Sequence, residues 1–281
     1  MGSIKNNHVY DRLFKALVHL ILMTGVIIMI WPFIWMVSTA IKPAAEVLLI
    51  PPKIIPSYLD WSHFRQVFSE IPIFRYFMNS IIVAGVGTVC ILITSALTGF
   101  VFAKYDFPAK RVLFYAILAT LMVPFQFYMI PLYSLMIKLG WVNTYQGIIF
   151  PQMISSFGTF FLKQNMESIP DDLLDAARID GCGELGIFKN VVVPISKASI
   201  SALGIFSFVT AWAEFMWPLI VTMDSEMYVL ELGLAMFQHQ FFVDYGKLMA
   251  GATFATLPVI IAFLFLRRNI IEGITLGGVK Y

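Results

Sequence analysis

Six long stretches that lack Asp, Glu, Lys and Arg dominate the chain, with Glu214 as the one interruption. Each is close to or longer than the roughly 20 residues that an α-helix needs to cross the hydrocarbon core of a membrane. A membrane β-barrel would instead show short segments in which apolar and polar residues alternate. The pattern therefore predicts an all-α integral membrane protein with six transmembrane helices. The expected helices cover residues 16–41, 76–103, 112–137, 139–162, 198–223 and 248–266.

The composition agrees with a membrane protein. Hydrophobic residues make up 59% of the chain and charged residues only 13%, and the mean hydropathy is +0.81. Soluble domains have about 45–50% apolar and about 25% charged residues. A net charge of +2 is too small to indicate a nucleic-acid surface. The first apolar stretch far exceeds the roughly 7–15 residues of a signal-peptide core, so we expect it to remain as an anchor.

The distribution of Lys and Arg predicts the topology. With the amino terminus inside, thirteen of the 19 basic residues fall on the cytoplasmic side of the expected helices. Cytoplasmic loops carry the excess of basic residues, so both termini are expected in the cytoplasm and the chain in the cytoplasmic membrane as a multi-pass protein. The expected parts are a cytoplasmic amino terminus (1–15), a single membrane domain (16–281), an outer loop (42–75), an inner loop (163–197) and a carboxyl-terminal tail (267–281).

The inner loop contains a predicted amphipathic helix. Pro170 suits a first helical turn, Asp171 and Asp172 complement the positive end of the helix dipole, and Gly181 favours a stop. Such a helix either lies on lipid headgroups or docks on a protein, and its acidic character disfavours an anionic leaflet. Helical spacing places Leu173, Ala176, Ala177 and Asp180 on one face and Asp172, Asp175 and Ile179 toward the other.

The same loop carries a recognisable motif. Asp175-Ala176-Ala177 is followed after three residues by Gly181, and after nine more by Val191-x-Val193-Pro194. This run resembles the EAA loop of ABC-importer permeases, with the pattern Glu-Ala-Ala, three residues, Gly, nine residues, Ile-x-Leu-Pro. The spacing matches throughout, while Asp replaces Glu and Val replaces both Ile and Leu. Asp175 keeps the charge of the family's Glu but is shorter by one methylene group.

Further segments are similar to the maltose-type branch of that family. They include Ile130-Pro131-Leu132-Tyr133, Asn143-Thr144-Tyr145 and the tail Gly273–Lys280, and the likeness covers about residues 30–281. Where that branch has Trp-Asn-Glu-Phe, this chain has Trp212-Ala213-Glu214-Phe215. The resemblance implies a type I ABC importer permease fold. It also implies a second homologous permease, two ATPase subunits, an extracellular solute-binding protein and a sugar or oligosaccharide cargo as partners in the lipid bilayer, with no nucleic acid.

The resemblance also implies residue roles. The inner-loop helix would sit in a cleft of the ATPase and transmit its closure to the membrane helices. The tail residues Gly277 and Gly278 either contact the ATPase or belong to a free terminus. The residues implied in ATPase coupling are Asp171, Asp172, Leu173, Asp175, Ala176, Ala177, Arg178, Asp180, Gly181 and Pro194.

The chain shows no signature of its own catalysis. It lacks the Gly-x-x-x-x-Gly-Lys-Ser/Thr phosphate cradle, so ATP and Mg²⁺ are expected on the partner ATPase. The four histidines show no pair at ligand spacing, so no metal or other cofactor is expected on this chain. We therefore predict a non-enzymatic membrane subunit.

Glu214 is the candidate for a role within the membrane, because a carboxylate there is costly unless it faces protein or water. It either lies on the translocation path or pairs structurally across helices. The candidate pathway residues are Asn79, Gln126, Trp212, Glu214 and Trp217.

The leading hypothesis is thus a sugar or oligosaccharide permease driven by a separate ATPase. One alternative is an ABC permease for another solute, such as a polyamine or a phosphonate. Another is a secondary transporter working alone, which would be expected to show charge relays and inverted repeats.

Overall fold

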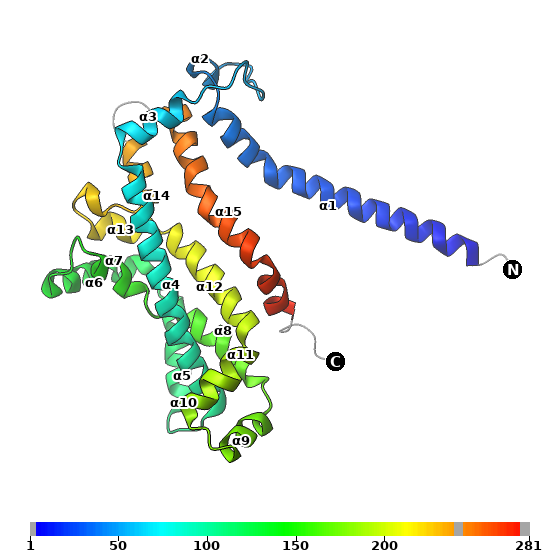
Figure 1. The fold of residues 1–281 in the computed structure, drawn as a ribbon, viewed down its shortest axis with the longest axis vertical. Helices are drawn as coiled ribbons and strands as arrows, with labels where there is room; N and C mark the ends of the chain where they lie inside the picture. The colour runs from blue at the N-terminus through cyan, green and yellow to red at the C-terminus, as the bar shows by residue number, and fades with distance from the viewer. Residues whose placement is uncertain (1–3, 239–243, 276–281) are drawn as a thin grey trace. The chain divides into compact units, whose positions relative to one another are not determined.

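The computed structural model describes residues 4–238 and 244–275, and this part of the chain is helical without a β-strand, which confirms the all-α prediction (Figure 1). The residues form two compact units, one from Met1–Glu70 with Gln238–Phe254 and one from Ile71–Phe237 with Ala255–Tyr281. The longer helices are α1 (Ile4–Ala40), α3 (Ser62–Glu70), α4 (Ile73–Lys104), α5 (Lys110–Ala119), α6 (Phe125–Leu139), α8 (Ser156–Glu167), α9 (Asp171–Ile179), α12 (Lys197–Trp212), α14 (Leu230–Gln238) and α15 (Tyr245–Thr275). The short ones are α2 (Ala44–Val47), η1 (Thr120–Met122), α7 (Tyr145–Ile149), η2 (Phe150–Gln152), α10 (Glu184–Ile187), η3 (Phe188–Val192), α11 (Val193–Ile195), α13 (Met216–Val221) and η4 (Ser225–Met227).

The first unit contains α1 and the outer loop. None of the α1 side chains from Tyr10 to Val37 is buried, so this helix relies on lipid or protein neighbours to cover its apolar surface. The loop after it folds back on its own backbone, and the Asp60 amide donates to the Ile41 carbonyl over 2.9 Å. The short helix α3 begins at Ser62, two residues after Asp60. The Asp60 carboxylate accepts the Ser62 amide at 2.8 Å, which supports this start.

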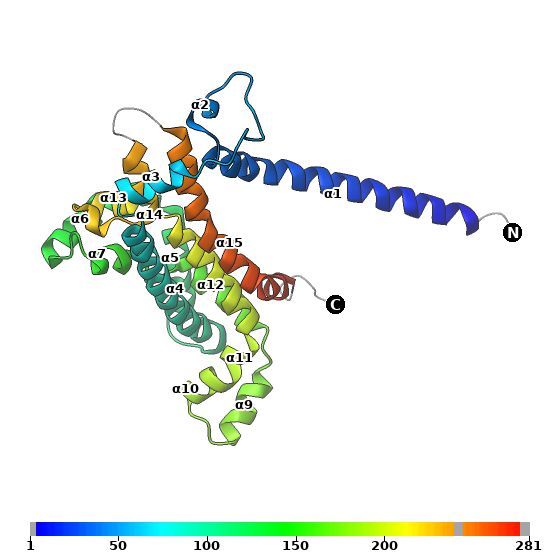
Figure 2. The ribbon, with the colours of Figure 1, turned by 45° about the horizontal axis from the view of Figure 1, so that its top comes forward.

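The second unit is built around α4, which packs along α8 and α12. Figure 2 shows α4 beside α12. Close approach depends on small residues. Gly99 of α4 lies against Leu162 and Lys163, and a side-chain carbon at Gly99 would come within 3.1 Å of the Leu162 Cβ. Gly158 of α8 lies in the same way against Ser95. Small residues at such crossings permit the packing that holds helices together in a membrane.

The structure corrects two of the expected helices. The stretch 112–137 is divided at Pro124, where the segments Lys110–Met122 and Phe125–Leu139 meet with a bend of 101°. The stretch 139–162 is not one helix, because Gly140 ends α6 with a φ of 69° and the chain restarts in α7, η2 and α8. Gly140 adopts the left-handed conformation that terminates helices.

The stretch 198–223 is also interrupted. Helix α12 ends at Trp212, α13 begins at Met216, and Glu214 lies between them. Within the described residues, α1, α4 and α15 are each long and apolar enough to cross a membrane. If each of two bent helix pairs forms one further span, the number of spans rises to five. Those pairs are Lys110–Met122 with Phe125–Leu139 and Glu184–Ile195 with Lys197–Trp212. The number of six spans and the cytoplasmic location of both termini stay predictions.

Candidate functional site

The inner-loop helix predicted between Pro170 and Gly181 is confirmed as α9. Pro170 precedes its first turn with a φ of −60°, and the Asp171 and Asp172 carboxylates lie in that turn. Gly181 follows the helix with a φ of 85°, a conformation that costs glycine little because it has no Cβ. Pro170 and the acidic first turn therefore lie at the start of α9, and Gly181 lies at its end, as the sequence predicted.

The faces of α9 differ from the sequence-based assignment. Leu174 and Ala177 are its buried residues, at 2% and 9% exposure. Leu173 and Ala176, which we expected to share a contact face with Ala177, are exposed instead. The spacing of three residues between Leu174 and Ala177 places both on the face that points into the protein. Ala176 is thus exposed to solvent, whereas its neighbour Ala177 is buried in the protein.

The buried face of α9 joins a hydrophobic cluster shared by several helices. Leu174 and Ala177 belong to the same cluster as Phe100 of α4, Leu162 of α8 and Leu203 of α12. An α-helix of nine residues is not stable by itself in water. Packing of this face, at about 1.5–3 kcal/mol for a buried leucine, therefore supplies much of the stability of α9.

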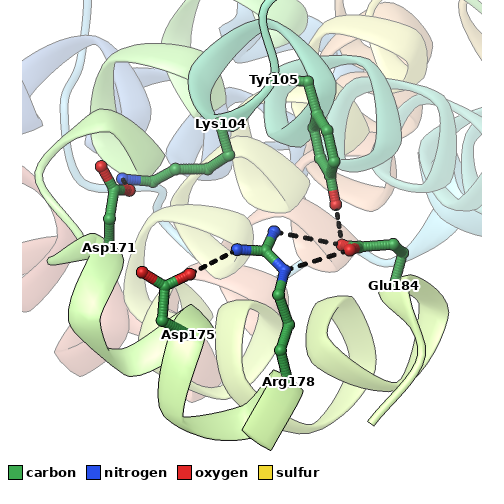
Figure 3. A network of polar contacts seen from close by, with 6 residues as sticks. All are labelled: Lys104, Tyr105, Asp171, Asp175, Arg178 and Glu184. Atoms are coloured by element: carbon green, nitrogen blue, oxygen red, sulfur yellow. Dashed lines mark hydrogen bonds and ion pairs between the residues drawn. The ribbon is translucent and has the colours of Figure 1, made fainter.

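An ion pair attaches the start of α9 to the end of α4. The Lys104 Nζ lies 2.8 Å from the Asp171 Oδ1 (Figure 3). It also donates to the Ile169 carbonyl. The lysine side chain is 5% exposed, whereas that of Asp171 is 77% exposed. The hydrogen bond from Lys104 lowers the pKa of Asp171 below its usual value.

A second network attaches the end of α9. The Arg178 guanidinium lies between two carboxylates, 2.7 Å from the Asp175 Oδ1 and 3.2 Å from the Glu184 Oε1 (Figure 3). The Tyr105 hydroxyl, at the end of α4, donates to Glu184. The Tyr105 hydrogen bond and then Arg178 lower the pKa of Glu184, and the two carboxylates raise the pKa of Arg178. Asp175, the residue that replaces the family's Glu, is therefore paired within its own helix.

Sequence reasoning did not find the partners in these two networks. Lys104, Tyr105 and Glu184 lie outside the motif, and only their contacts show that they belong to the site. One signal was available in the sequence, since Lys104 follows an apolar stretch directly and the inner loop is acidic. Pro194 lies in α11, is exposed, and is preceded by the π-helical turn η3.

The outward surface of α9 and α10 combines apolar and acidic groups. Leu173, Ile179 and Leu185 are 46%, 87% and 77% exposed, and Asp172 and Asp180 are exposed beside them. We call this set the α9 surface. Exposed leucine and isoleucine side chains surrounded by carboxylates suit a protein partner with an apolar hollow and a basic rim.

Three of the candidate pathway residues have their polar atoms occupied by the fold. The Trp212 and Trp217 indoles are buried and donate to the carbonyls of Ala255 and Gly147 over 3.1 and 2.9 Å. Asn79 is also buried, and its amide donates to the Glu226 and Tyr228 carbonyls while accepting from the Tyr145 hydroxyl.

The other two candidates, Gln126 and Glu214, are more accessible. Gln126 is exposed on α6. Glu214 is half-buried, and its Oε1 accepts the Trp217 amide at 3.2 Å. Among the hydrogen bonds of the described residues, this one alone joins two of the five candidates. The tail residues Gly277 and Gly278 lie outside the described residues. Within the described residues, no group of three or more His, Cys, Asp and Glu side chains is arranged to hold a metal.

The comparisons with known proteins identify the family. Residues 95–275 match the family described as the inner membrane component of binding-protein-dependent transport systems. The chain belongs to this family. The arabinooligosaccharide permease AraQ of Halalkalibacterium halodurans is 36% identical over 90% of this chain and 92% of that protein. The diacetylchitobiose permease NgcG of Streptomyces coelicolor is 29% identical over 95% and 89%.

A solved structure supports the fold. A bacterial ABC transporter involved in the import of the acidic polysaccharide alginate matches with a TM-score of 0.80 over 92% of this chain and 97% of that chain. Its sequence identity is 21%, so this likeness concerns the fold alone. The expected ABC importer permease fold is confirmed. The chain is a permease component of the cytoplasmic membrane, in a family whose members are non-catalytic.

Proposed function

We propose that this chain is one of two permease subunits in an ATP-driven importer that carries a sugar or an oligosaccharide into the cell. The similarity to AraQ, over nearly the full length of both proteins, supports the cargo class. NgcG, named for a disaccharide, supports it as well. Neither relative is named for a polyamine or a phosphonate. The importer would also contain a second homologous permease, two ATPase subunits that bind ATP and Mg²⁺, and an extracellular binding protein.

The α9 surface is the proposed contact with the ATPase. The observation that carries this proposal is the division of α9 between a face packed into the α4–α8–α12 cluster and an outward surface with Leu173 and Ile179. A partner that moves α9 would therefore move the membrane helices with it. The alternative, a helix that lies on lipid headgroups, would place several carboxylates against an anionic leaflet and is disfavoured.

The motif residues then take different roles. Asp172, Leu173, Ala176 and Asp180 would face the ATPase, whereas Ala177 would anchor α9 to the membrane helices. Asp171, Asp175 and Arg178 would hold α9 in position through their ion pairs. Gly181 and Pro194 would shape the turns that follow. Gly277 and Gly278 remain a proposed second contact with the ATPase.

Co-purification tests the assembly. We would co-express the chain with the products of neighbouring genes, purify through a tag on this subunit, and assay for an ATPase. The variant Ala176→Asp adds a charge on the exposed side of α9 and should abolish ATPase association without unfolding the subunit. The matched control, Gln164→Glu, adds a charge at an exposed position of α8 and should retain the ATPase.

Uptake of labelled arabinotriose into proteoliposomes tests the cargo. The complete importer should accumulate the sugar only with ATP. If the purified chain alone transported sugar with no ATPase, the stand-alone transporter would replace this proposal. If the complete importer accumulated spermidine or a phosphonate and no saccharide, the cargo assignment would be wrong.

A further inference from the structure

A groove of about 690 Å³ lies in the first unit, between the carboxyl-terminal end of α1 and the outer loop. It is lined by none of the coupling residues and none of the candidate pathway residues. Apolar surface of this kind marks a place where protein or lipid binds. The apolar side chains that form most of its wall are Phe33, Ile34 and Val37 of α1 and Ile54, Ile55 and Leu59 of the loop.

The groove exists because the outer loop turns back along the helix that precedes it. The Ser38 hydroxyl donates to the Ile54 carbonyl, and the Asp60 amide donates to the Ile41 carbonyl. The loop therefore runs beside the last turns of α1. These turns belong to the apolar stretch 16–41, which is expected to cross the membrane. Both walls of the groove are thus expected within the bilayer or at its surface.

Aromatic side chains place the groove near the boundary between membrane and water. Trp31 of α1, Tyr58 of the groove wall and Trp61 are all exposed. Tryptophan and tyrosine concentrate at the level of the lipid headgroups. Lys42 is the first charged residue after the expected span, and its Nζ lies 4.1 Å from the centre of the Trp35 ring. The groove therefore extends from the headgroup level into the hydrocarbon region.

A lysine lies at the polar rim of the groove. Lys53 precedes Ile54 in the chain, and its Nζ lies 3.1 Å from the Oγ of Ser57, which lines the groove. It also lies 2.8 Å from the Glu46 Oε1. An ammonium group has three N–H donors, and among the hydrogen bonds of the described residues Lys53 uses two. A phosphate group at the bilayer surface would accept the third.

The dimensions favour a lipid chain over a helix of another protein. The groove follows α1 from Phe33 to Ile41, a length of about 12 Å along the helix axis. The hydrocarbon layer of one leaflet is about 15 Å thick. An α-helix is about 10 Å across, so two turns of it occupy roughly 850 Å³ and exceed the volume of the groove. An acyl chain is thinner and is apolar along its whole length.

We propose that this groove binds one acyl chain of a phospholipid, with the phosphate group of that lipid beside Lys53. The lipid comes from the leaflet at the carboxyl-terminal end of α1, which is the outer leaflet in the expected topology. Its chain fills the space between α1 and the loop and so holds the loop against the helix. This inference concerns the membrane and does not depend on the cargo of the proposed importer.

Native mass spectrometry tests the groove. The full chain, purified in detergent with the subunits that accompany it, is titrated with palmitoyl-oleoyl phosphatidylglycerol. Val37→Phe fills the space of about two methylene groups, and each buried methylene contributes about a fourfold factor, so about fifteenfold more lipid should be needed. The matched control Val26→Phe makes the same change at an exposed valine of α1 outside the groove and should bind like the wild type.

The pair of valine variants decides whether the groove is a specific site. If both variants weaken lipid binding equally, or neither does, α1 contacts only bulk lipid and the proposal is wrong. Lys53→Met tests the placement of the phosphate and should weaken binding about two- to fivefold, because the lost charge lies in water-exposed surroundings. Lys138→Met, which removes an exposed charge at the end of α6, should leave binding unchanged. Equal effects of the two lysine variants would overturn the phosphate assignment.

Photochemical cross-linking identifies the occupant in the membrane of intact cells. Benzoylphenylalanine in place of Ile55, an exposed residue of the groove wall, should capture a phospholipid, seen as a mass adduct on the loop peptide. The same group in place of Ile179, which is equally exposed on α9 outside the expected spans, should capture none. Capture of a second permease or of a binding protein at Ile55 would overturn the lipid assignment and leave the proposed function unchanged.

Discussion

Two adjacent leucines in α9 provide a test of the division between its packed and outward faces. Leu174 is 2% exposed and belongs to the hydrophobic cluster, whereas Leu173 is 46% exposed. Truncating a buried leucine to alanine costs about 2–5 kcal/mol, while exposed positions usually change stability by about 0.5 kcal/mol or less. Leu174→Ala and Leu173→Ala thus make the same chemical change in opposite environments.

The expected consequence of Leu174→Ala is detachment of α9. The helix has nine residues, too few to be stable alone, and Leu174 and Ala177 are its two buried side chains. A loss of about 3 kcal/mol shifts the equilibrium toward the detached loop by about a hundredfold. The ATPase would then have to reorder α9 on binding, so its affinity would fall in proportion to the fraction of attached α9, by up to the same factor.

Leu173→Ala should leave α9 attached and still weaken the ATPase complex. Burial of the Leu173 side chain against the ATPase would contribute about 1–2 kcal/mol, so the affinity should fall about five- to thirtyfold. Hydrogen exchange of the amides in residues 171–180 reports the attachment of α9, and biolayer interferometry with the purified ATPase reports the affinity. Accelerated exchange is expected in Leu174→Ala alone.

Two results would refute this reasoning. If Leu173→Ala accelerated exchange as much as Leu174→Ala, the exposed face would be contributing to the packing of α9. If Leu174→Ala kept both wild-type exchange and wild-type ATPase affinity, α9 would not depend on the cluster. In either case, the proposal that α9 transmits motion through its buried face would be abandoned.

Three further predictions concern other parts of the chain. Gly147→Ala should lower the free energy of unfolding by about 3 kcal/mol, because its new Cβ would clash with the Trp141 carbonyl oxygen. Gly85→Ala enters open space on α4 and should not lower it, and thermal unfolding in detergent measures both variants. The hydrogen bond from Lys104 lowers the pKa of Asp171, so the stabilisation from this ion pair is present at neutral pH and is lost as the pH falls through the lowered pKa. Hydrogen exchange of α9 should therefore accelerate in acid, and Lys104→Met should abolish this acceleration. In the outer loop, hydrogen bonds from Lys53 and Ser57 lower the pKa of Glu46 to about 2, and Lys53→Met should raise it toward the ordinary value in a carbon-13 NMR titration, with an unchanged value contradicting the assignment.

The sequence predicted best those helices that depend on hydrophobicity alone. Helices α1, α4 and α15 include the expected stretches 16–41, 76–103 and 248–266 almost completely. The breaks in the other stretches were not predicted, because hydropathy registers the absence of charge and not backbone geometry. Pro124 and Gly140 are the residues that set two of these breaks, and each is compatible with a membrane helix in a pattern of apolar residues.

The sequence predicted where α9 begins and ends, but it did not predict which residues α9 contacts in the folded protein. The ends of α9 follow from Pro170 and Gly181, which act on the residues next to them. The sequence analysis grouped Ala177 with Leu173 and Ala176 and did not say which side of α9 is buried. Of these three residues only Ala177 is buried, together with Leu174, because neighbouring helical positions differ by about 100° and small residues do not by themselves mark the packed side. The partners Lys104 and Tyr105 lie far from the motif along the chain, and a single sequence does not specify such contacts.

The packing of α4 and α12 suggests how the α9 surface would act on a pocket of about 220 Å³ that is lined by residues of both helices and by Glu214. On α12, Leu203 belongs to the cluster that holds α9, and Ser207 lines the pocket four residues later, a rise of about 6 Å along the helix axis. On α4, Ala96 and Ile91 have the same relation over five residues. A rigid displacement of α9 that tilts α4 relative to α12 would therefore alter the pocket directly, because both walls are continuous with the cluster. Closely packed helices change between discrete arrangements rather than deforming gradually, so the state of the ATPase would determine the shape of this pocket.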